Sequence, residues 1–209
     1  MDEKIDRMYQ HVRSVFRQPG SHGLDHTLRV VYLCEQIGNR ERADMRIVLP
    51  AALFHDIARP LEEEKGIPHE VEGARIAEQF LRSIRYEEEL IQKIIHAIRT
   101  HRYRSVEKPE TLEARILSDA DKLDAMGAVG IARTFMRAGE HHGEIGDATS
   151  HIREKLLNLK SLMYTETART IAEERDRVLH DFLETLTAEI TIPGSPPEKP
   201  VTGKKSESE

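Results

Sequence analysis

A histidine and an aspartate stand next to each other in the apolar stretch "AALFHDIAR" at residues 51–59. The apolar neighbours of His55 and Asp56 indicate burial, and an unpaired charge in an apolar environment is costly. Imidazole nitrogens and carboxylate oxygens bind divalent metal ions, and a cation would neutralise the buried carboxylate. Adjacent residues of a helix diverge by about 100°, so the two side chains need some bending to reach one ion. The pair indicates a metal site or a hydrogen-bonded pair without a metal.

Further histidines and aspartates lie on the apolar faces of other segments. On a helical wheel, His26 projects from the apolar side of the segment 24–40. His101 lies on the apolar face of the segment 87–102, whereas His96 points nearly the opposite way. In the stretch "ILSDADKLDAMGA", three aspartates lie among apolar residues: Asp119, Asp121 and Asp124. Several such residues in one small core favour a metal site more than any of them does alone.

The elements that must position these residues are helices. Apolar residues recur with helical spacing, without sustained alternation, in eight segments: 2–17, 24–40, 44–59, 69–82, 87–102, 111–138, 150–163 and 165–190. The remainder from residue 192 is rich in Pro, Gly and Ser and charged, which predicts disorder. The sequence therefore predicts one all-α domain of about eight helices over residues 1–191 and a disordered tail over 192–209.

Composition narrows the class of protein further. The chain has 209 residues, of which 33% are charged and 38% hydrophobic, as in a globular domain. Its net charge of −6 gives no nucleic-acid footprint, and a single cysteine, Cys34, fits a reducing compartment. The N-terminus is charged, and no apolar run reaches the roughly 18 residues of a membrane span. We expect a soluble cytoplasmic protein.

The ordered set His26, His55–Asp56 and Asp121 resembles the H…HD…D signature of the HD-domain metal-dependent phosphohydrolases. Longer stretches resemble one prokaryotic subgroup in order and spacing: "SHGLDHTLRV", "AALFHDIAR", "HEVEGA", "AIRTHRYR" and "ILSDADKLDAMGAVGIARTF". The resemblance covers residues 18–190 and implies a helical bundle of the HD type.

The resemblance implies four metal ligands: His26, His55, Asp56 and Asp121. The pattern alone does not choose Asp121, because Asp124 lies nearer the apolar face. Asp119 and Asp124 then become supporting or helix-capping residues, and His22 a hydrogen-bonding neighbour of the site. His69 and His101 occupy places where some HD families bind a second metal; positioning of water or substrate is the alternative for both.

A divalent metal makes hydroxide available near neutral pH and polarises a phosphoryl oxygen. We expect catalytic roles for Asp56, His101 and Lys122. Developing phosphate charge needs cationic partners, and the candidates near the ligands are Arg59, Lys122 and Arg133. Arg29 and Arg102 are weaker candidates, and each cation could instead serve in a surface ion pair.

The leading interpretation is a metal-dependent phosphohydrolase that releases phosphate or pyrophosphate from a nucleotide or another small phosphorylated metabolite. Its cofactor would be a divalent metal: Mn, Mg, Co, Ni, Zn or Fe. Two alternatives stay open: a di-iron oxygenase on the same scaffold, and a non-catalytic nucleotide-sensing module. We expect no membrane or nucleic-acid partner, and the apolar helix stripes would allow a homodimer.

Overall fold

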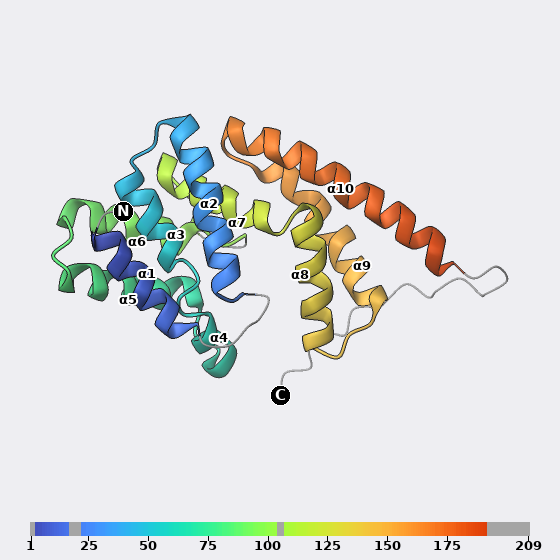
Figure 1. The fold of residues 1–209 in the computed structure, drawn as a ribbon, viewed down its shortest axis with the longest axis horizontal. Coiled ribbons are helices and arrows are strands. Elements are labelled where there is room, and N and C mark those ends of the chain that lie inside the picture. Colours follow the sequence, from blue (N-terminus) through green and yellow to red (C-terminus); the bar gives the residue numbers. More distant parts are fainter. Residues whose placement is uncertain (1–2, 17–21, 104–106, 192–209) are drawn as a thin grey trace.

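The structure is a computed structural model that describes residues 3–16, 22–103 and 107–191, and every regular element in these ranges is a helix. Figure 1 shows them in chain order. They are α1 (Glu3–Val15), α2 (Leu24–Glu41), α3 (Met45–Phe54), α4 (Arg59–Lys65), α5 (His69–Ser83), α6 (Glu88–Thr100), α7 (Leu112–Asp124), α8 (Gly127–Glu140), α9 (Ile145–Glu154), the 3-10 helix η1 (Leu156–Leu162) and α10 (Glu166–Ile190). The prediction of an all-α fold is confirmed.

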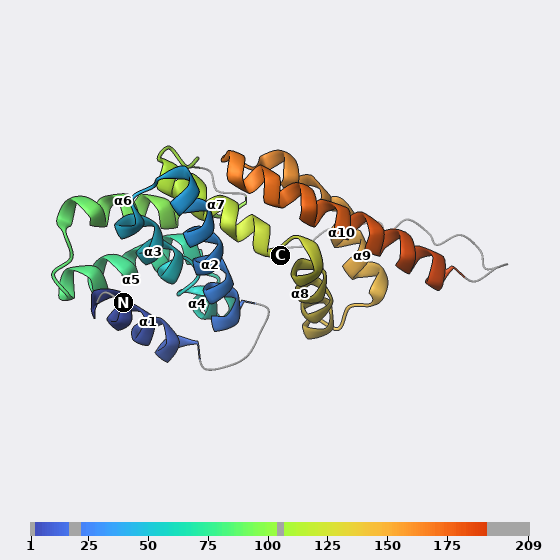
Figure 2. The same cartoon turned by 45° about the horizontal axis from the view of Figure 1, so that its top comes forward.

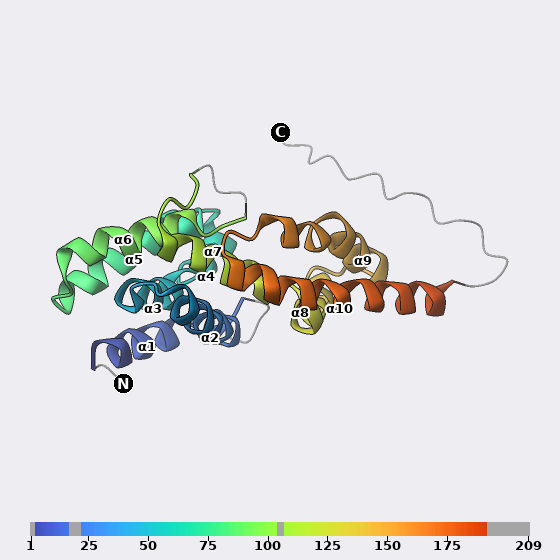
Figure 3. The ribbon, with the colours of Figure 1, turned by 90° about the horizontal axis from the view of Figure 1, so that it is seen from above.

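The helices form a body and an arm. Helices α1–α7 make the body, in which α2, α3, α6 and α7 pack on one another (Figure 1). Figure 2 shows α1 at the outside of the body, where it packs on α3. Helices α8, α9 and α10 form the arm, and α10 runs along it away from the body (Figure 3). Helix α7 contacts α8, η1 and α10, so it joins the two parts.

One apolar core connects the body with the arm. It extends from Met8 in α1 to Leu183 in α10 and includes the fully buried Phe54 and Leu117. The predicted apolar stripe of α2 is buried in it: Val30, Leu33, Cys34 and Ile37. Among the described residues, none of the helices combines the length and the apolar character of a membrane-spanning segment.

The segment 44–59, predicted as one helix, is interrupted at the His–Asp pair. Helix α3 ends at Phe54, residues 55–58 form turns, and α4 begins at Arg59. Pro60 is the physical reason: inside a continuous helix it would lack the N–H for the carbonyl of Asp56, and its ring would clash with that carbonyl. At the start of α4 the missing N–H of Pro60 costs no hydrogen bond, because the first N–H groups of a helix have no partner within it.

Two other predicted segments are also divided. The segment 111–138 separates into α7 and α8 at Gly127, whose φ of +67° favours glycine. The helix predicted over 150–163 is instead two elements: α9, which begins earlier at Ile145, and the 3-10 helix η1. Helix α10 ends at Ile190. The predicted tail over 192–209 lies outside the described residues, so the boundary at 191 stays a prediction.

Candidate metal centre

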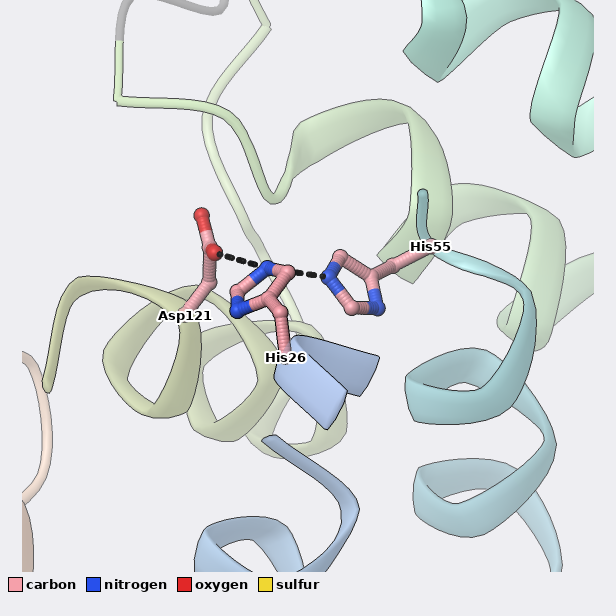
Figure 4. Close-up of side chains that lie close together, drawn as sticks. All are labelled: His26, His55 and Asp121. Atoms are coloured by element: carbon pink, nitrogen blue, oxygen red, sulfur yellow. Dashed lines mark hydrogen bonds and ion pairs between the residues drawn. The ribbon is translucent and has the colours of Figure 1, made fainter. Parts of the chain in front are cut away.

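Four predicted ligands come together where three helices begin or end. His26 lies in the first turn of α2, Asp121 in the last turn of α7, and His55 and Asp56 in the turn after α3. All are buried except Asp121, whose side chain is 23% exposed. Figure 4 shows the His26 and His55 rings and the Asp121 carboxylate directed toward one another.

The Nε2 atom of His26 is the centre of this group. Its neighbours are His55 Nε2 at 3.3 Å, Asp121 Oδ1 at 3.4 Å and Asp56 Oδ2 at 3.4 Å. His55 Nε2 and Asp56 Oδ2 lie 3.8 Å apart, although adjacent helical residues diverge by about 100°. Both residues lie in the turn after α3, outside the regular helix. This turn allows the two side chains to approach each other.

A second group meets the other oxygen of Asp56. His69 begins α5, and His101 directly follows α6. Asp56 Oδ1 lies 3.3 Å from His69 Nε2 and 3.7 Å from His101 Nε2, and the two nitrogens are 3.3 Å apart. All three side chains are buried. His96 lies outside this group and accepts a hydrogen bond from the N–H of Glu110.

Hydrogen bonds on the far side of the rings fix which ring nitrogen carries the proton. His55 Nδ1 donates to the carbonyl of Ala52 at 2.7 Å, and His101 Nδ1 donates to the carbonyl of Ile98 at 2.6 Å. Because a carbonyl oxygen only accepts, Nδ1 must carry the proton in both rings. In the neutral rings, Nε2 therefore presents a lone pair to the centre.

Acceptor atoms consequently face one another at short range. The Nε2 atoms of His69 and His101 face each other, and Asp56 Oδ2 is buried with no hydrogen-bond partner among the described residues. An unsatisfied buried acceptor is unfavourable, so Asp56 Oδ2 and the facing Nε2 atoms of His69 and His101 favour a bound cation or another donor. Within each group the ligand atoms lie within 4.8 Å of one another: His26, His55 and Asp121 in one, and Asp56, His69 and His101 in the other. These atoms fit a divalent metal ion.

The charges of the site follow from burial and close contacts. Burial by itself would raise the pKa of Asp56, but Arg59 and the neighbouring imidazoles hold it well below its usual range. The pKa of Asp121 is likewise well below normal, since His26 outweighs burial. Burial lowers the pKa of His55 to about 4. For His26, burial is outweighed by the neighbouring carboxylates of Asp121, Asp124 and Asp56, which raise the pKa to about 10.

Asp124 lies behind His26 and is not part of the ligand group. It accepts a hydrogen bond from His26 Nδ1 at 2.8 Å, and Arg29 Nε and Arg133 Nη1 donate to it at 2.7 and 2.8 Å. These partners hold the pKa of the buried Asp124 carboxyl at about 2. The structure thus separates the two aspartates that the helical pattern left open: Asp121 faces the centre, and Asp124 orients a ring.

Asp119 lies away from the centre and fastens α10 to α7. Its carboxylate accepts hydrogen bonds from the backbone N–H groups of Tyr164 and Thr165 at 2.9 and 2.8 Å. The Thr165 hydroxyl donates to the same carboxylate and accepts from the N–H of Ala168, which caps α10. Asp119 is therefore a capping and packing residue.

The cationic candidates occupy different places. Arg59 donates to Asp56 Oδ1 at 3.0 Å, and Arg133 reaches the site through Asp124. Lys122 is buried and donates to Ser118. The His22 ring packs edge-on against His26, with 5.7 Å between the ring centroids.

Glu62 was not among the predicted site residues. Its carboxylate accepts hydrogen bonds from Arg59 at 2.8 Å, from His69 Nδ1 at 2.8 Å and from Arg102 at 3.0 Å. It also belongs to a third group of potential ligands with His69 and Glu70. The position of Glu62 three residues after Arg59 on one helix was the available signal, but only the fold brings His69 to it.

Relatives of the chain match both its sequence and its fold. The HD domain family model matches residues 23–126. The protein YpgQ of Bacillus subtilis is 38% identical over 194 residues, which cover 88% of this chain and 91% of YpgQ. The crystal structure of YpgQ in complex with ADP superposes with a TM-score of 0.76 at 33% identity, covering 91% of this chain and 98% of that one.

Two further relatives show how much of the chain the similarity covers. The crystal structure of an HD-superfamily hydrolase from Bacillus thuringiensis has a TM-score of 0.72 at 30% identity, covering 90% of this chain and 96% of that one. Ribonuclease Y of Desulforudis audaxviator is 30% identical over 106 residues, which are 51% of this chain but 19% of that enzyme. The family match and the likeness to the HD-superfamily hydrolase over most of both chains show that this chain belongs to the HD-domain superfamily of metal-dependent phosphohydrolases.

Proposed function

We propose that this protein hydrolyses a phosphate ester or anhydride of a nucleotide, with His26, His55, Asp56 and Asp121 as the ligands of one divalent metal ion. One observation carries the proposal: one imidazole nitrogen and two carboxylate oxygens from distant parts of the chain lie within 3.4 Å of His26 Nε2. Carboxylates in such a core are tolerated when a cation neutralises them.

When bound by these residues, a divalent metal ion would supply a water molecule of lowered pKa and would polarise a phosphoryl oxygen. The chain positions the other participants. Asp56 has one oxygen toward each group, so it can accept a proton from an attacking water and hold its orientation. The Nε2 atoms of His69 and His101 lie beside Asp56. Their lone pairs could bind a second ion or accept hydrogen bonds from a positioned water.

Nucleotides are the proposed substrates for two reasons. YpgQ, which matches most of this chain, has been crystallised with ADP. The centre is also bordered by the cationic side chains that phosphate requires in the transition state. Arg59 and Arg133 are held in place by Asp56 and Asp124, and Lys122 follows the ligand Asp121 directly.

The test is a panel of nucleoside mono-, di- and triphosphates, each incubated with the metal-free protein and Mn, Mg, Co, Ni, Zn or Fe. Free phosphate and pyrophosphate are scored separately. We expect turnover that requires a metal and falls in Asp121→Ala by more than the roughly 100-fold cost of losing an outer partner of a metal site. His96→Ala is the matched control, because His96 lies outside both groups.

The panel also discriminates against the other two functions. Oxygen consumption by the iron-loaded protein without phosphate release would support the oxygenase. Nucleotide binding without turnover under any metal would support the sensing module. Either result would contradict the proposed phosphohydrolase.

A further inference from the structure

A groove follows the C-terminal end of α10 on the arm, and we call it the arm groove. Figure 3 shows this end of α10 extending beyond α8 and α9. The groove has a volume of about 840 Å³. Its α10 wall consists of His180, Leu183, Glu184, Thr187, Ala188 and Thr191. Positions with this spacing form one face of a helix, and Arg153 of α9 and Leu157 of η1 form the other wall.

The arm groove is partly apolar and carries charges of both signs. Leu157 and Leu183 supply apolar surface, and Leu183 is 5% exposed. Arg153 lies near the middle of the α10 wall, because its Nη2 donates to the hydroxyl of Thr187 at 3.0 Å. Glu184, one turn earlier on α10, supplies the opposite charge. Such a surface suits an apolar segment with one charge of each sign at its middle.

The chain itself supplies such a segment directly after α10. Thr191, the last described residue, lines the groove, and its φ of −75° and ψ of 107° lead the chain out of the helix. The sequence continues with "IPGSPPEKPV" over 192–201. Pro193–Gly194 favours a type II turn, which reverses the direction of a chain. The three prolines that follow favour the extended polyproline II conformation.

The length of this segment matches the length of the groove. From His180 to Thr191 the α10 wall spans about 16 Å, at roughly 1.5 Å per residue of helix. Residues 196–201 span about 19 Å in polyproline II, at roughly 3.1 Å per residue. The segment is therefore long enough to cover the groove once, in the direction opposite to α10.

We propose that residues 196–201 of this chain dock in the arm groove, antiparallel to α10. The middle of the segment is Glu198–Lys199, and the middle of the groove carries Arg153 and Glu184, so each charge meets one of opposite sign. The prolines and Val201 cover the apolar walls. Polyproline II is extended before it binds, which lowers the entropic cost, and the short connection to α10 gives an effective concentration in the millimolar range. This surface belongs to the arm, so the inference goes beyond the proposed function.

Backbone order parameters from NMR relaxation of the full chain test the docking. We expect an order parameter of about 0.85 for Val201 and below about 0.6 for Ser206, because docked backbone is rigid and free backbone is not. In Ala188→Lys a long charged side chain occupies the groove, so the value for Val201 should fall below about 0.6. A wild type in which Val201 is as mobile as Ser206 would overturn the inference.

Ala132→Lys is the matched control. Ala132 is also an exposed alanine of the arm, but it lies on α8 and does not line the groove. Because both alanines are exposed, both variants should keep the helical circular dichroism of the wild type. Equal order parameters of Val201 in Ala132→Lys and Ala188→Lys would show that the groove does not hold the segment.

A second variant changes only the segment and leaves every described residue unchanged. Replacing both Pro196 and Pro197 by glycine removes their preference for polyproline II. We expect the order parameter of Lys199 to fall below about 0.6 in this variant. A value equal to that of the wild type would contradict docking in the polyproline II conformation.

A second copy of the chain is the alternative occupant of the groove. Docking within one chain predicts that the order parameter of Val201 does not change on tenfold dilution. Loss of order on dilution, together with a dimer in light scattering, would assign the groove to a second copy and overturn the inference. Mn²⁺ affinity should be equal in the wild type and Ala188→Lys, so this test and the test of the metal centre are independent.

Discussion

At the residue scale, each imidazole of the centre is held in one orientation by an acceptor behind it. Backbone carbonyls serve His55 and His101, and carboxylates serve His26 and His69. Such outer partners fix the tautomer and the direction of the lone pair of a ligand. The carboxylate behind His26 is itself held by two arginines, so the position of this ring is set before an ion binds.

Metal binding should release protons from His26. In the metal-free protein its pKa is about 10, so it is protonated at neutral pH and must lose a proton to bind a metal. His55, with a pKa of about 4, and Asp56, with a pKa well below normal, are already deprotonated. We expect release of about one proton per ion at pH 7, and affinity that rises about tenfold per pH unit below 10.

Calorimetry in buffers of different ionisation enthalpy measures this release. The matched control is His96→Ala, which should release the same number of protons because His96 lies outside the ligand groups. Metal affinity that does not change between pH 6 and pH 8 would contradict the assignment of His26.

At the element scale, the site depends on where helices end. The metal ligands were predicted from the order of His26, His55–Asp56 and Asp121, but the His55–Asp56 pair was predicted to lie inside a continuous helix. Pro60 was the readable signal for the break after Phe54. The contact of Tyr164 with Lys122 gave no local signal, because it depends on packing between α7 and residues 45 positions further along the chain.

The fastening of α10 to α7 gives a prediction about stability. Asp119→Ala would leave the buried N–H of Thr165 and the N–H of Tyr164 without their acceptor. We expect the free energy of unfolding to fall by on the order of 2–3 kcal/mol. Urea denaturation followed by circular dichroism measures it, with the exposed Asp181→Ala on α10 as control.

Mn²⁺ affinity should be unchanged in folded Asp119→Ala, because Asp119 belongs to neither ligand group. A loss of stability no larger than that of Asp181→Ala would show that Asp119 does not fasten the arm. A loss of Mn²⁺ affinity in the folded variant would instead place Asp119 in the metal centre.

At the scale of the whole molecule, the HD domain match covers helices α2–α7 of the body, whereas the arm lies outside the matched residues. Helical periodicity predicted the all-α class and the apolar side of α2, since burial of one face imposes a 3.6-residue repeat. The matched HD domain covers residues 23–126, whereas α8, α9 and α10 follow it. Distances between ligands from distant segments arise only from packing, so the sequence could name candidate ligands but not the division between Asp121 and Asp124.

An anomalous difference map from a crystal of this protein soaked in Mn²⁺ tests the four-ligand metal site directly. We expect a peak bounded by His26 Nε2, His55 Nε2, Asp56 Oδ2 and Asp121 Oδ1. A second peak beside His69 and His101 would add a second ion to the same centre. A fully soaked crystal without a peak among the four ligands would contradict the account.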